Sequence, residues 1–365
     1  MTQTISKKQL EDQEKNYYFQ RFISKKGDEY GLRFGKPQDA EVILNMFKEI
    51  YQYNYAYPLI YDIEYLRKEL SNQNNFWFVG ELLENKEIAG AGLLKKKRYI
   101  GHAGQAVVKK KFQGQGITSK IGAAGILTVT KMPQFKDVLK IDSEVRGLKI
   151  GAQKLFQHAR AVPYGLIPAY INYGDKRHFN IDDRTPVPPL QEEPAILYSI
   201  IFNNLWKKRD KTVHLLDDEN LLFFYNYVKR MSNHMNKDIL ILDRSHKNKD
   251  YELYGVSKDL YEGRVNFFGY VKQKSLKHLL KVYNKWRIII WKIPTTQNGI
   301  SSMALAIKKG FKIVGYDIGF NNINWTLFDS VIFAYYPNTN NHFVKANCLD
   351  DTKPLAKKIN ELFET

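Results

Sequence analysis

Apolar and polar positions in the first half of the chain alternate between the spacing of strands and the spacing of helices. Residues 30–35 (YGLRFG) predict a short strand that ends at the Lys36-Pro37 pair. The next segment predicts a helix, because its apolar residues recur at helical spacing: Val42, Ile43, Met46, Phe47 and Ile50. Residues 74–97 predict two strands joined by a turn at residues 84–86, which is the pattern of a hairpin.

Strands and helices continue in turn after this hairpin. Residues 101–108 predict a third strand, which leads into a turn that contains glycines. Beyond the turn the pattern predicts helices at residues 116–131 and 150–162, and strands at residues 137–145 and 164–171. This order predicts a mixed central sheet with helices on both faces, an α/β (α+β) fold.

The second half of the chain repeats the ending of the first. Residues 182–194 contain four prolines and several charges, which indicates a linker or an exposed loop. A buried strand, a helix and two more strands are then predicted between residues 286 and 337. We expect four parts: an N-terminal charged arm at residues 1–28, a first domain at 29–180, a linker at 181–211 and a second domain at 212–365.

The charge of the chain favours an anionic partner. Its 56 Lys and Arg residues and 38 Asp and Glu residues give a formal net charge of +18. Such a charge favours binding to a nucleotide or nucleic acid, although it can also do no more than keep the protein soluble. The single cysteine, Cys348, excludes an internal disulfide framework and fits a reducing compartment. No window approaches the roughly 18 apolar residues of a membrane-spanning helix, and residues 1–28 hold no apolar core of signal-peptide type. We therefore expect a cytoplasmic protein without a membrane span.

A glycine turn lies between the predicted strand at 101–108 and the helix that follows it. Gly114 and Gly116 bring bare amides to a helix start, where the helix dipole favours a phosphate. Local charge comes from four lysines, Lys109, Lys110, Lys111 and Lys120. The dinucleotide pattern fails because Ser119 stands at its third glycine, and the Walker pattern is absent. A tight turn beside a solvated lysine face is the alternative interpretation.

The segment VVKKKFQGQGIT, residues 107–118, resembles the acetyl-CoA signature of the GCN5-related N-acetyltransferases (GNAT). The signature spans Gln113 to Thr118, and Thr118 takes a place where the family has glycine or alanine. The order of elements over residues 29–175 is similar too, with Arg33 on the first strand and Asp39 soon after it. This resemblance implies the acyl-CoA N-acyltransferase fold, with acetyl-CoA, or another acyl-CoA, as the cosubstrate.

By this resemblance, the backbone amides of about residues 114–119 hold the CoA pyrophosphate, and the preceding strand faces the acetyl group. The implied cofactor-binding residues are Ala106, Val107, Val108, Gln113, Gly114, Gln115, Gly116, Ile117, Thr118 and Ser119. In the second half, Gly310-Phe311 and Gly315-Tyr316 resemble the ending of the family, but no Gly-x-Gly turn follows residue 195. We therefore expect a degenerate second GNAT-like domain that binds no CoA.

The implied reaction is direct attack of an amine on the acetyl thioester, which needs a base for the amine proton. Family bases are often a glutamate on the strand before the glycine turn, and that strand has no acid here. Our candidate catalytic residues are Glu144, near the end of the next strand, and His102. Phe156 stands where the family often has a tyrosine that protonates the leaving thiolate. No metal-ligand spacing is recognisable, so we expect no metal.

The sequence predicts an acetyl-CoA-dependent N-acyltransferase (EC 2.3.1 type) that acts on an amine, for which we favour a small molecule over a protein. Two other classes stay open. The missing strand glutamate and the phenylalanine at 156 fit a non-catalytic CoA-binding module. Lysine clusters with neighbouring aromatic residues, at 95–99 and 206–210, fit a basic protein that acts on nucleic acid.

Overall fold

The computed structural model describes residues 17–177, 191–243, 252–338 and 345–364. Contacts group the chain into two compact units, Met1–Ile141 and Asp142–Thr365. Both units combine strands with helices, so the predicted α/β (α+β) class is confirmed.

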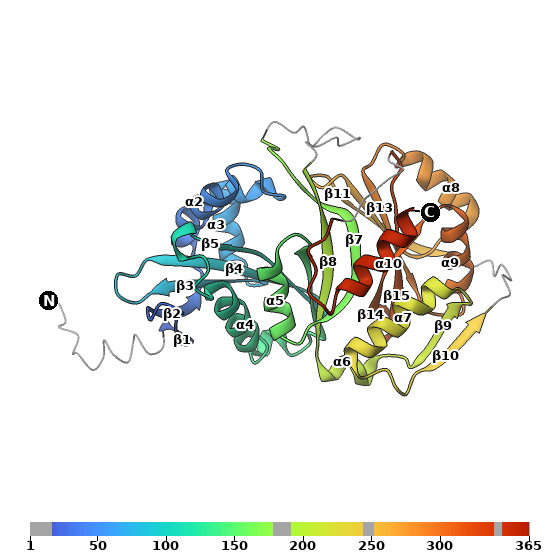
Figure 1. Ribbon diagram of the computed structural model, residues 1–365, viewed down its shortest axis with the longest axis horizontal. Helices are drawn as coiled ribbons and strands as arrows, with labels where there is room; N and C mark the ends of the chain where they lie inside the picture. The colour runs from blue at the N-terminus through green and yellow to red at the C-terminus, as the bar shows by residue number, and fades with distance from the viewer. Residues whose placement is uncertain (1–16, 178–190, 244–251, 339–344, 365) are drawn as a thin grey trace. The chain divides into compact units, whose positions relative to one another are not determined.

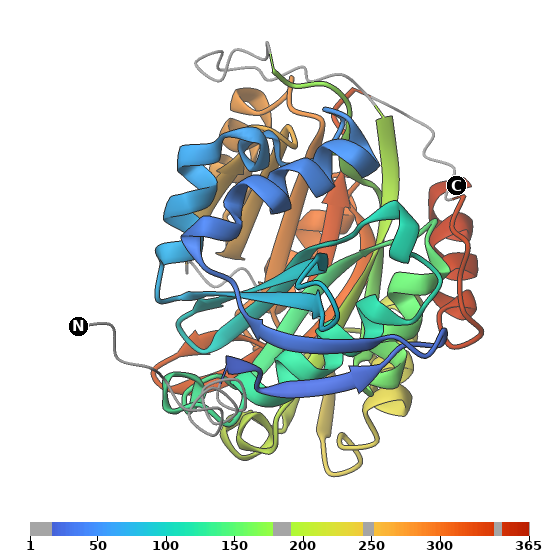
Figure 2. The same ribbon diagram turned by 90° about the vertical axis from the view of Figure 1, so that its left-hand side faces the viewer.

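The first unit is built on five antiparallel strands in sequence order. They are β1 (Gln20–Ile23), β2 (Glu29–Phe34), β3 (Asn75–Leu82), β4 (Ile88–Lys97) and β5 (Ile100–Val108). Figure 2 shows β1 and β2 side by side at the edge of this sheet. Three helices pack on the sheet, α2 (Ala40–Tyr51) and α3 (Ile63–Ser71) on one face and α4 (Ile117–Val129) on the other (Figure 1).

The second unit starts within strand β6 (Lys140–Arg146) and holds eight strands of a mixed sheet. Their spatial order is β6, β8 (Gln191–Ile201), β7 (Val162–Tyr173), β14 (Lys312–Ile323), β15 (Thr326–Tyr335), β13 (Ile288–Pro294), β12 (Arg264–Tyr270) and β11 (Leu253–Asp259). A separate parallel pair is formed by β9 (Thr212–Leu216) and β10 (Ile239–Asp243). The helices are α5 (Ile150–His158), α6 (Asn203–Lys208), α7 (Glu219–Ser232), α8 (Gln273–Val282), α9 (Gly299–Lys308) and α10 (Lys353–Glu364).

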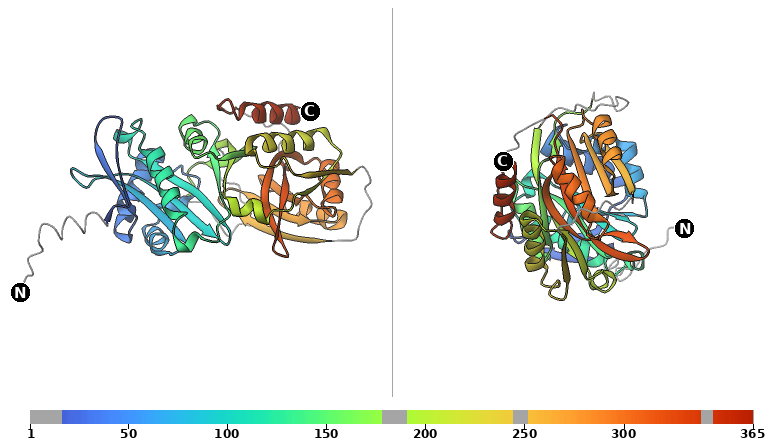
Figure 3. Two further views of the ribbon diagram at one scale, coloured as in Figure 1. Left: turned by 90° about the horizontal axis from the view of Figure 1, so that it is seen from below. Right: turned by 90° about the vertical axis from the view of Figure 1, so that its right-hand side faces the viewer.

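The α10 helix lies against the sheet of the second unit and was not predicted from the sequence. Together with α7 it packs across β7 and β14, and the left view of Figure 3 shows both helices on the same side of these strands. Leu355 and Ile359 point into this contact and are fully buried. The C-terminal segment therefore completes the core of the second unit.

The sheet of the second unit contains an internal repeat. The segment β6-α5-β7-β8 recurs as β13-α9-β14-β15, and the two strand orders mirror each other across the β7–β14 pair. The strand β7 has register shifts at Pro163/Gly165 and at Ile167/Ile171. The strand β14 has them at Ile313/Gly315 and at Asp317/Asn321, so each shift in β14 comes 150 residues after its counterpart in β7, as with 165 and 315. Residues with positive φ angles are also 150 positions apart: Arg160 matches Gly310, and Ala169 matches Gly319. The predicted repeat of the first half's ending is therefore confirmed for these elements.

Two predicted parts differ from the structure. Residues 20–23, which we assigned to a charged arm, form β1, while residues 1–16 lie outside the described part of the chain. The range 181–211 was predicted as a linker, yet its described part forms β8 and α6. Pro194 misled the prediction, because it lies in β8 opposite the irregular part of β7, where a strand tolerates a residue without an N–H group. The division into domains at 180 and 212 stays a prediction.

Candidate functional site

The predicted glycine turn lies between β5 and α4. A short 3-10 turn at Lys110–Phe112 precedes it, and α4 begins at Ile117. Gly114 and Gly116 have φ angles of 77° and 81°, a region that residues with a side chain rarely adopt. The first backbone N–H groups of a helix lack intrahelical partners, and here they follow directly on Gly116. The turn therefore presents the start of a helix to an anion, and neither Gly114 nor Gly116 has a side chain that would block it.

Two glutamine side chains brace this turn from within. Gln113 Nε2 donates a hydrogen bond to the carbonyl oxygen of Val108 (3.2 Å), and Gln115 Nε2 donates to that of Lys111 (3.3 Å). Gln115 is buried, and its Oε1 accepts from the hydroxyl of Tyr30 (3.5 Å). These side chains hold the loop's shape, so the backbone is the part of the turn that remains for a ligand.

Local positive charge at the turn is lower than the four lysines suggested. Lys109 Nζ and Lys111 Nζ both pair with Glu87, at 2.9 and 2.8 Å. The hydrogen bond from Lys111 is the largest cause of the lowered pKa of Glu87. Lys120, in the first turn of α4, is exposed. An anion at this turn would therefore rely chiefly on backbone amides.

Strand β5 carries a bulge just before the turn. Val107 pairs with Ala91 and Gly104 with Leu93, so two residues of β5 lie opposite the single residue Gly92. One of the two, Gln105, has a φ angle of 49°, which is strained for a residue with a side chain. The other is Ala106. Bulges interrupt the ladder of a sheet and often lie beside active sites.

The predicted cofactor-binding residues form one continuous path from this bulge to the helix. Ala106 is exposed at the bulge, whereas Val107 and Val108 are buried at the end of β5. Beyond the turn, Ile117 is buried at the start of α4, and Thr118 is exposed in the first turn of this helix. The structure thus brings the residues from 106 to 119 together, and their role in binding a cofactor remains a prediction.

Close packing fixes the direction of α4. Ile121 lies directly over two glycines of the sheet, so that a Cβ atom on Gly80 or Gly90 would come within 2.6 or 3.1 Å of its side chain. One turn later, the ring of Phe78 occupies the place of a Cβ atom on Gly125. These glycines therefore let α4 pack closely on the sheet, and this packing fixes the position of its first turn.

Arg33 and Asp39 form a buried ion pair. Arg33 Nη1 and Nη2 donate to the two carboxylate oxygens of Asp39 (2.7 and 2.9 Å), and Nε donates to Glu81 Oε2 (2.5 Å). Tyr18 completes the cluster through its hydroxyl, which donates to Glu81 Oε1 (2.9 Å). Burial opposes the charge of Arg33, but the hydrogen bonds outweigh it and raise its pKa. This cluster ties β2 to the start of α2, and the sequence analysis missed Glu81 as its third member.

The two candidate bases lie on different strands. His102 is half-buried on β5, opposite Lys95 of β4, whose amino group pairs with Glu69. Glu144 is half-buried on β6, and its Oε1 accepts a hydrogen bond from the hydroxyl of Tyr170 (3.3 Å). Tyr170 was not singled out from the sequence, because no local pattern connects it to a residue 26 positions earlier.

The second half offers no equivalent of the glycine turn in its described residues. Gly269, a lone glycine at the end of β12, has a φ angle of 95°. A Cβ atom there would lie 2.3 Å from the carbonyl oxygen of Leu253 on the paired strand β11. This glycine is therefore explained by close strand pairing. Phe156, at the place of the family's tyrosine, is a core residue that stacks on Tyr198 with ring centroids 5.7 Å apart.

No group of three or more His, Cys, Asp or Glu side chains is arranged to hold a metal ion within residues 17–177, 191–243, 252–338 and 345–364. In the same ranges, every helix is too short or too polar to cross a membrane.

Comparisons with known proteins find acetyltransferases among solved structures. A ribosomal-protein-S5-alanine acetyltransferase from Vibrio fischeri is 18% identical, covering 50% of this chain and 98% of its own, with a TM-score of 0.38. A GNAT-family acetyltransferase from Streptococcus pneumoniae is 16% identical over 47% of this chain and 99% of its own (TM-score 0.36). A spermidine N-acetyltransferase from Vibrio cholerae is 15% identical over 47% and 93% (TM-score 0.36). The scan against protein-family models and the search of curated proteins found no match.

Each of these matches covers about half of this chain and nearly the whole of the solved structure.

Proposed function

We propose that the protein is an N-acyltransferase that transfers an acetyl group from acetyl-CoA, or another acyl group from its CoA thioester, to an amine. The observation that carries the proposal is the sequence of features from 104 to 119: a bulge in β5, a turn with two positive-φ glycines, and the start of α4. The turn suits a pyrophosphate. The bulge lies a few residues before it, on the strand that faces the acetyl group by the resemblance.

The backbone of this path would hold the cosubstrate. The proposed binding residues are those of the sequence prediction, from Ala106 to Val108 and from Gln113 to Ser119. A Cβ atom on Gly114 would meet nothing within 4 Å, and one on Gly116 would meet only the side chain of Lys25, at 3.8 Å. Because the side chains of Gln113 and Gln115 are engaged within the loop, amides rather than side chains would carry the recognition.

The reaction requires a new bond from the amine nitrogen to the acyl carbon and the loss of the carbon–sulfur bond. We propose Glu144 as the base that takes the amine proton, directly or through water, with His102 as the alternative. Amides at the β5 bulge would donate to the carbonyl oxygen as negative charge develops on it. A thiolate is already a good leaving group, so the absence of a hydroxyl at Phe156 is compatible with turnover.

The acceptor is proposed from chemistry alone. We favour a small amine over a protein, and place the reaction in the cytoplasm because the single cysteine fits a reducing compartment. The half-chain likeness to GNAT structures includes a spermidine N-acetyltransferase, which makes polyamines a reasonable first choice in a screen.

Consumption of acetyl-CoA should be measured across polyamines, amino acids, aminoglycosides and peptides. Turnover of at least one amine, with product formation matching thiol release, is the expected result. Isothermal titration should give one CoA per chain, because Gly269 serves strand pairing and the described part of the second half has no second glycine turn. A stoichiometry near two would contradict this assignment.

One alternative has a specific observation in its favour. Phe156 is buried in the core, and β5 has no acidic residue, as a CoA-binding module without catalysis would allow. Binding of CoA without turnover of any amine would favour this module. A nucleic-acid function rests on the net charge and on the lysine clusters at 95–99 and 206–210, and would show as an affinity for RNA or DNA that falls steeply with salt.

A further inference from the structure

The second irregularity of β7 turns three backbone carbonyls away from the sheet ladder. Ile167 pairs with Ala195 of β8, and regular pairing resumes only at Ile171 with Glu193. Between them, Ala169 has a φ angle of 47°, a strained conformation for a residue with a side chain. A strained backbone persists only where its surroundings hold it, so the contacts of residues 168–170 indicate what this bulge is for.

Side chains from the second half of the chain bind all three carbonyls. The hydroxyl of Tyr336 donates to the carbonyl oxygen of Pro168 (2.7 Å). Arg287 donates to the carbonyl of Ala169 through Nη1 and to that of Tyr170 through Nη2 (2.9 Å). Arg264 Nη1 adds a longer hydrogen bond to the carbonyl of Tyr170 (3.4 Å). The backbone of the bulge is thus fixed from the second half.

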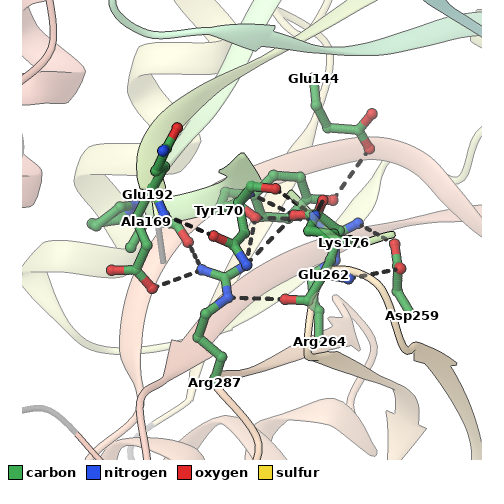
Figure 4. A network of polar contacts seen from close by, with 12 residues as sticks. Glu144, Ala169, Tyr170, Lys176, Glu192, Asp259, Glu262, Arg264 and Arg287 are labelled. Atoms are coloured by element: carbon green, nitrogen blue, oxygen red, sulfur yellow. Dashed lines mark hydrogen bonds and ion pairs between the residues drawn. The ribbon is translucent and has the colours of Figure 1, made fainter. Parts of the chain in front are cut away.

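The side chain of Tyr170 is held at both ends. The guanidinium of Arg264 lies over its ring, with Cζ 3.8 Å from the ring centroid. Both side chains belong to residues less than a tenth exposed, so this cation–π contact is largely shielded from water. At the other end, the Tyr170 hydroxyl donates to Glu144 Oε1 (3.3 Å). Figure 4 shows Glu144, Tyr170 and Arg264 in one chain of contacts.

Two acidic residues keep the two arginines in place. Arg287 Nε donates to the carbonyl oxygen of Glu262 (2.9 Å), and Arg264 Nη2 donates to Asp259 Oδ2 (3.0 Å). The Glu262 carboxylate accepts from Lys176 Nζ (3.3 Å), and both of these side chains are almost fully buried. Because Lys176 follows β7, and the other residues lie on or beside β11, β12 and β13, this network links β7 to those three strands (Figure 4).

The second repeat lacks the hydroxyl that this network supports in the first. At the offset of 150 residues that relates β7 to β14, Tyr170 corresponds to Phe320, which has no hydroxyl. A cation still lies over the ring, since Lys292 Nζ is 3.8 Å from the centroid of Phe320. A cation thus lies over both rings, from β12 for Tyr170 and from β13 for Phe320, whereas the hydroxyl occurs only in the first repeat.

We propose that Tyr170 is a positioning residue for Glu144, and that Arg264 and Arg287 of the second half hold Tyr170 in place; this inference rests on the proposed function. The hydroxyl orients the carboxylate that takes the amine proton. The second half then contributes to the reaction without binding CoA, by fixing the strand of the first repeat that carries the hydroxyl.

The variant Tyr170→Phe tests this directly, because it removes one oxygen and keeps the ring beneath Arg264. We expect kcat to fall roughly threefold to tenfold with CoA affinity unchanged. The acidic limb of the pH–rate profile should move upward by roughly half a pH unit to one unit, since a donor to the charged carboxylate is lost. Besides the arginines and their partners, Asp142 on β6, Tyr164 on β7 and Asp317 on β14 are ionisable groups of this region.

Arg264→Met should also move the acidic limb of the pH–rate profile upward, because the ring of Tyr170 loses the planar cation that lies over it. Phe320→Leu is the matched control in the second repeat, and should leave both kcat and the pH profile as in the wild type. Circular dichroism and thermal unfolding establish that each variant folds. If Arg264→Met does not fold, the Tyr170→Phe result decides alone, and an unchanged kcat and pH profile there would overturn the proposal.

A measurement independent of turnover separates this inference from the proposed function. Titration of the Glu144 carboxyl by ¹³C NMR, assigned with Glu144→Gln, should show a higher pKa in Tyr170→Phe than in the wild type. If the wild type acetylates no amine, the proposed function fails, and this titration still decides whether Tyr170 acts on Glu144. An identical titration in both proteins would overturn the inference even if the enzyme is active.

Discussion

Gly165 and Gly315 face each other where β7 pairs with β14, at the centre of the internal repeat. A Cβ atom on Gly165 would lie 2.7 Å from the carbonyl oxygen of Val314, and one on Gly315 would lie 2.7 Å from that of Tyr164. Neither backbone can give way without separating the two strands. The junction between the repeats therefore depends on the absence of two side chains.

Gly315→Ala should destabilise the second unit by about 1–3 kcal/mol, the usual range for overpacking a dense interior. Urea unfolding followed by circular dichroism measures this as a lower midpoint. Gly151→Ala on α5 is the matched control, because a Cβ atom there would meet nothing within 4 Å and alanine favours a helix. Equal stability of Gly315→Ala and the wild type would show that β14 and β7 can move apart without cost.

Gly116→Val should weaken CoA binding at least tenfold, which is about 1.4 kcal/mol. The φ angle of 81° disfavours a β-branched residue, and the new side chain would stand beside the amides that start α4. Calorimetry on the folded variant is the measurement. Gly255→Ala, a glycine on β11 with room for a Cβ atom, should bind CoA as the wild type does. Unchanged affinity in Gly116→Val would remove the turn from the proposed site.

Glu144→Gln should lower turnover roughly 10²-fold, the low end for loss of a general base. The amide keeps the size of the carboxylate and cannot take the amine proton, so the acidic limb of the pH–rate profile should disappear. CoA affinity should barely change. His102→Gln is the paired variant: a large loss there, with Glu144→Gln near the wild type, would assign the base to the histidine. If neither variant loses activity, positioning of a neutral amine suffices.

Glu87→Gln should reduce stability at neutral pH by less than about 1 kcal/mol, because its partners Lys109 and Lys111 are partly exposed. The pKa of Glu87 is lowered in the folded state. Its stabilisation is therefore complete above its ordinary value of 4.5 and is lost as the pH falls through the lowered value. Thermal unfolding from pH 7 to pH 3 should show a smaller acid-induced loss in the variant. Parallel curves for both proteins would contradict the assigned ion pairs.

The sequence alone was sufficient for elements whose signal is local. Helices such as α2 have apolar residues at helical spacing, and β3 and β4 are separated by a polar turn, so neighbours in sequence determine them. The glycine turn was also predictable, because only glycine readily adopts the φ angles found at 114 and 116. The repeat was visible for the same reason, since each copy carries its own helix-to-strand pattern.

Other features depended on residues that are distant in sequence. β1 and β8 were missed because their pairing with other strands outweighs their charged or proline-containing sequences. Glu81 completes the Arg33 cluster from a position 48 residues away, and Glu87 takes up two of the lysines that the sequence assigned to the turn.

The arrangement around Glu144 was decided by the tertiary structure. Its sequence neighbours identify an acid near a strand end and nothing more. Tyr170 reaches it because β7 bulges at Ala169, and Arg264 and Arg287 hold that bulge from about a hundred residues further along the chain. Local patterns determine which segments become strands and helices. The partners of a buried charge are determined only when those segments pack, since a desolvated charge must then be neutralised by whichever groups the fold places beside it.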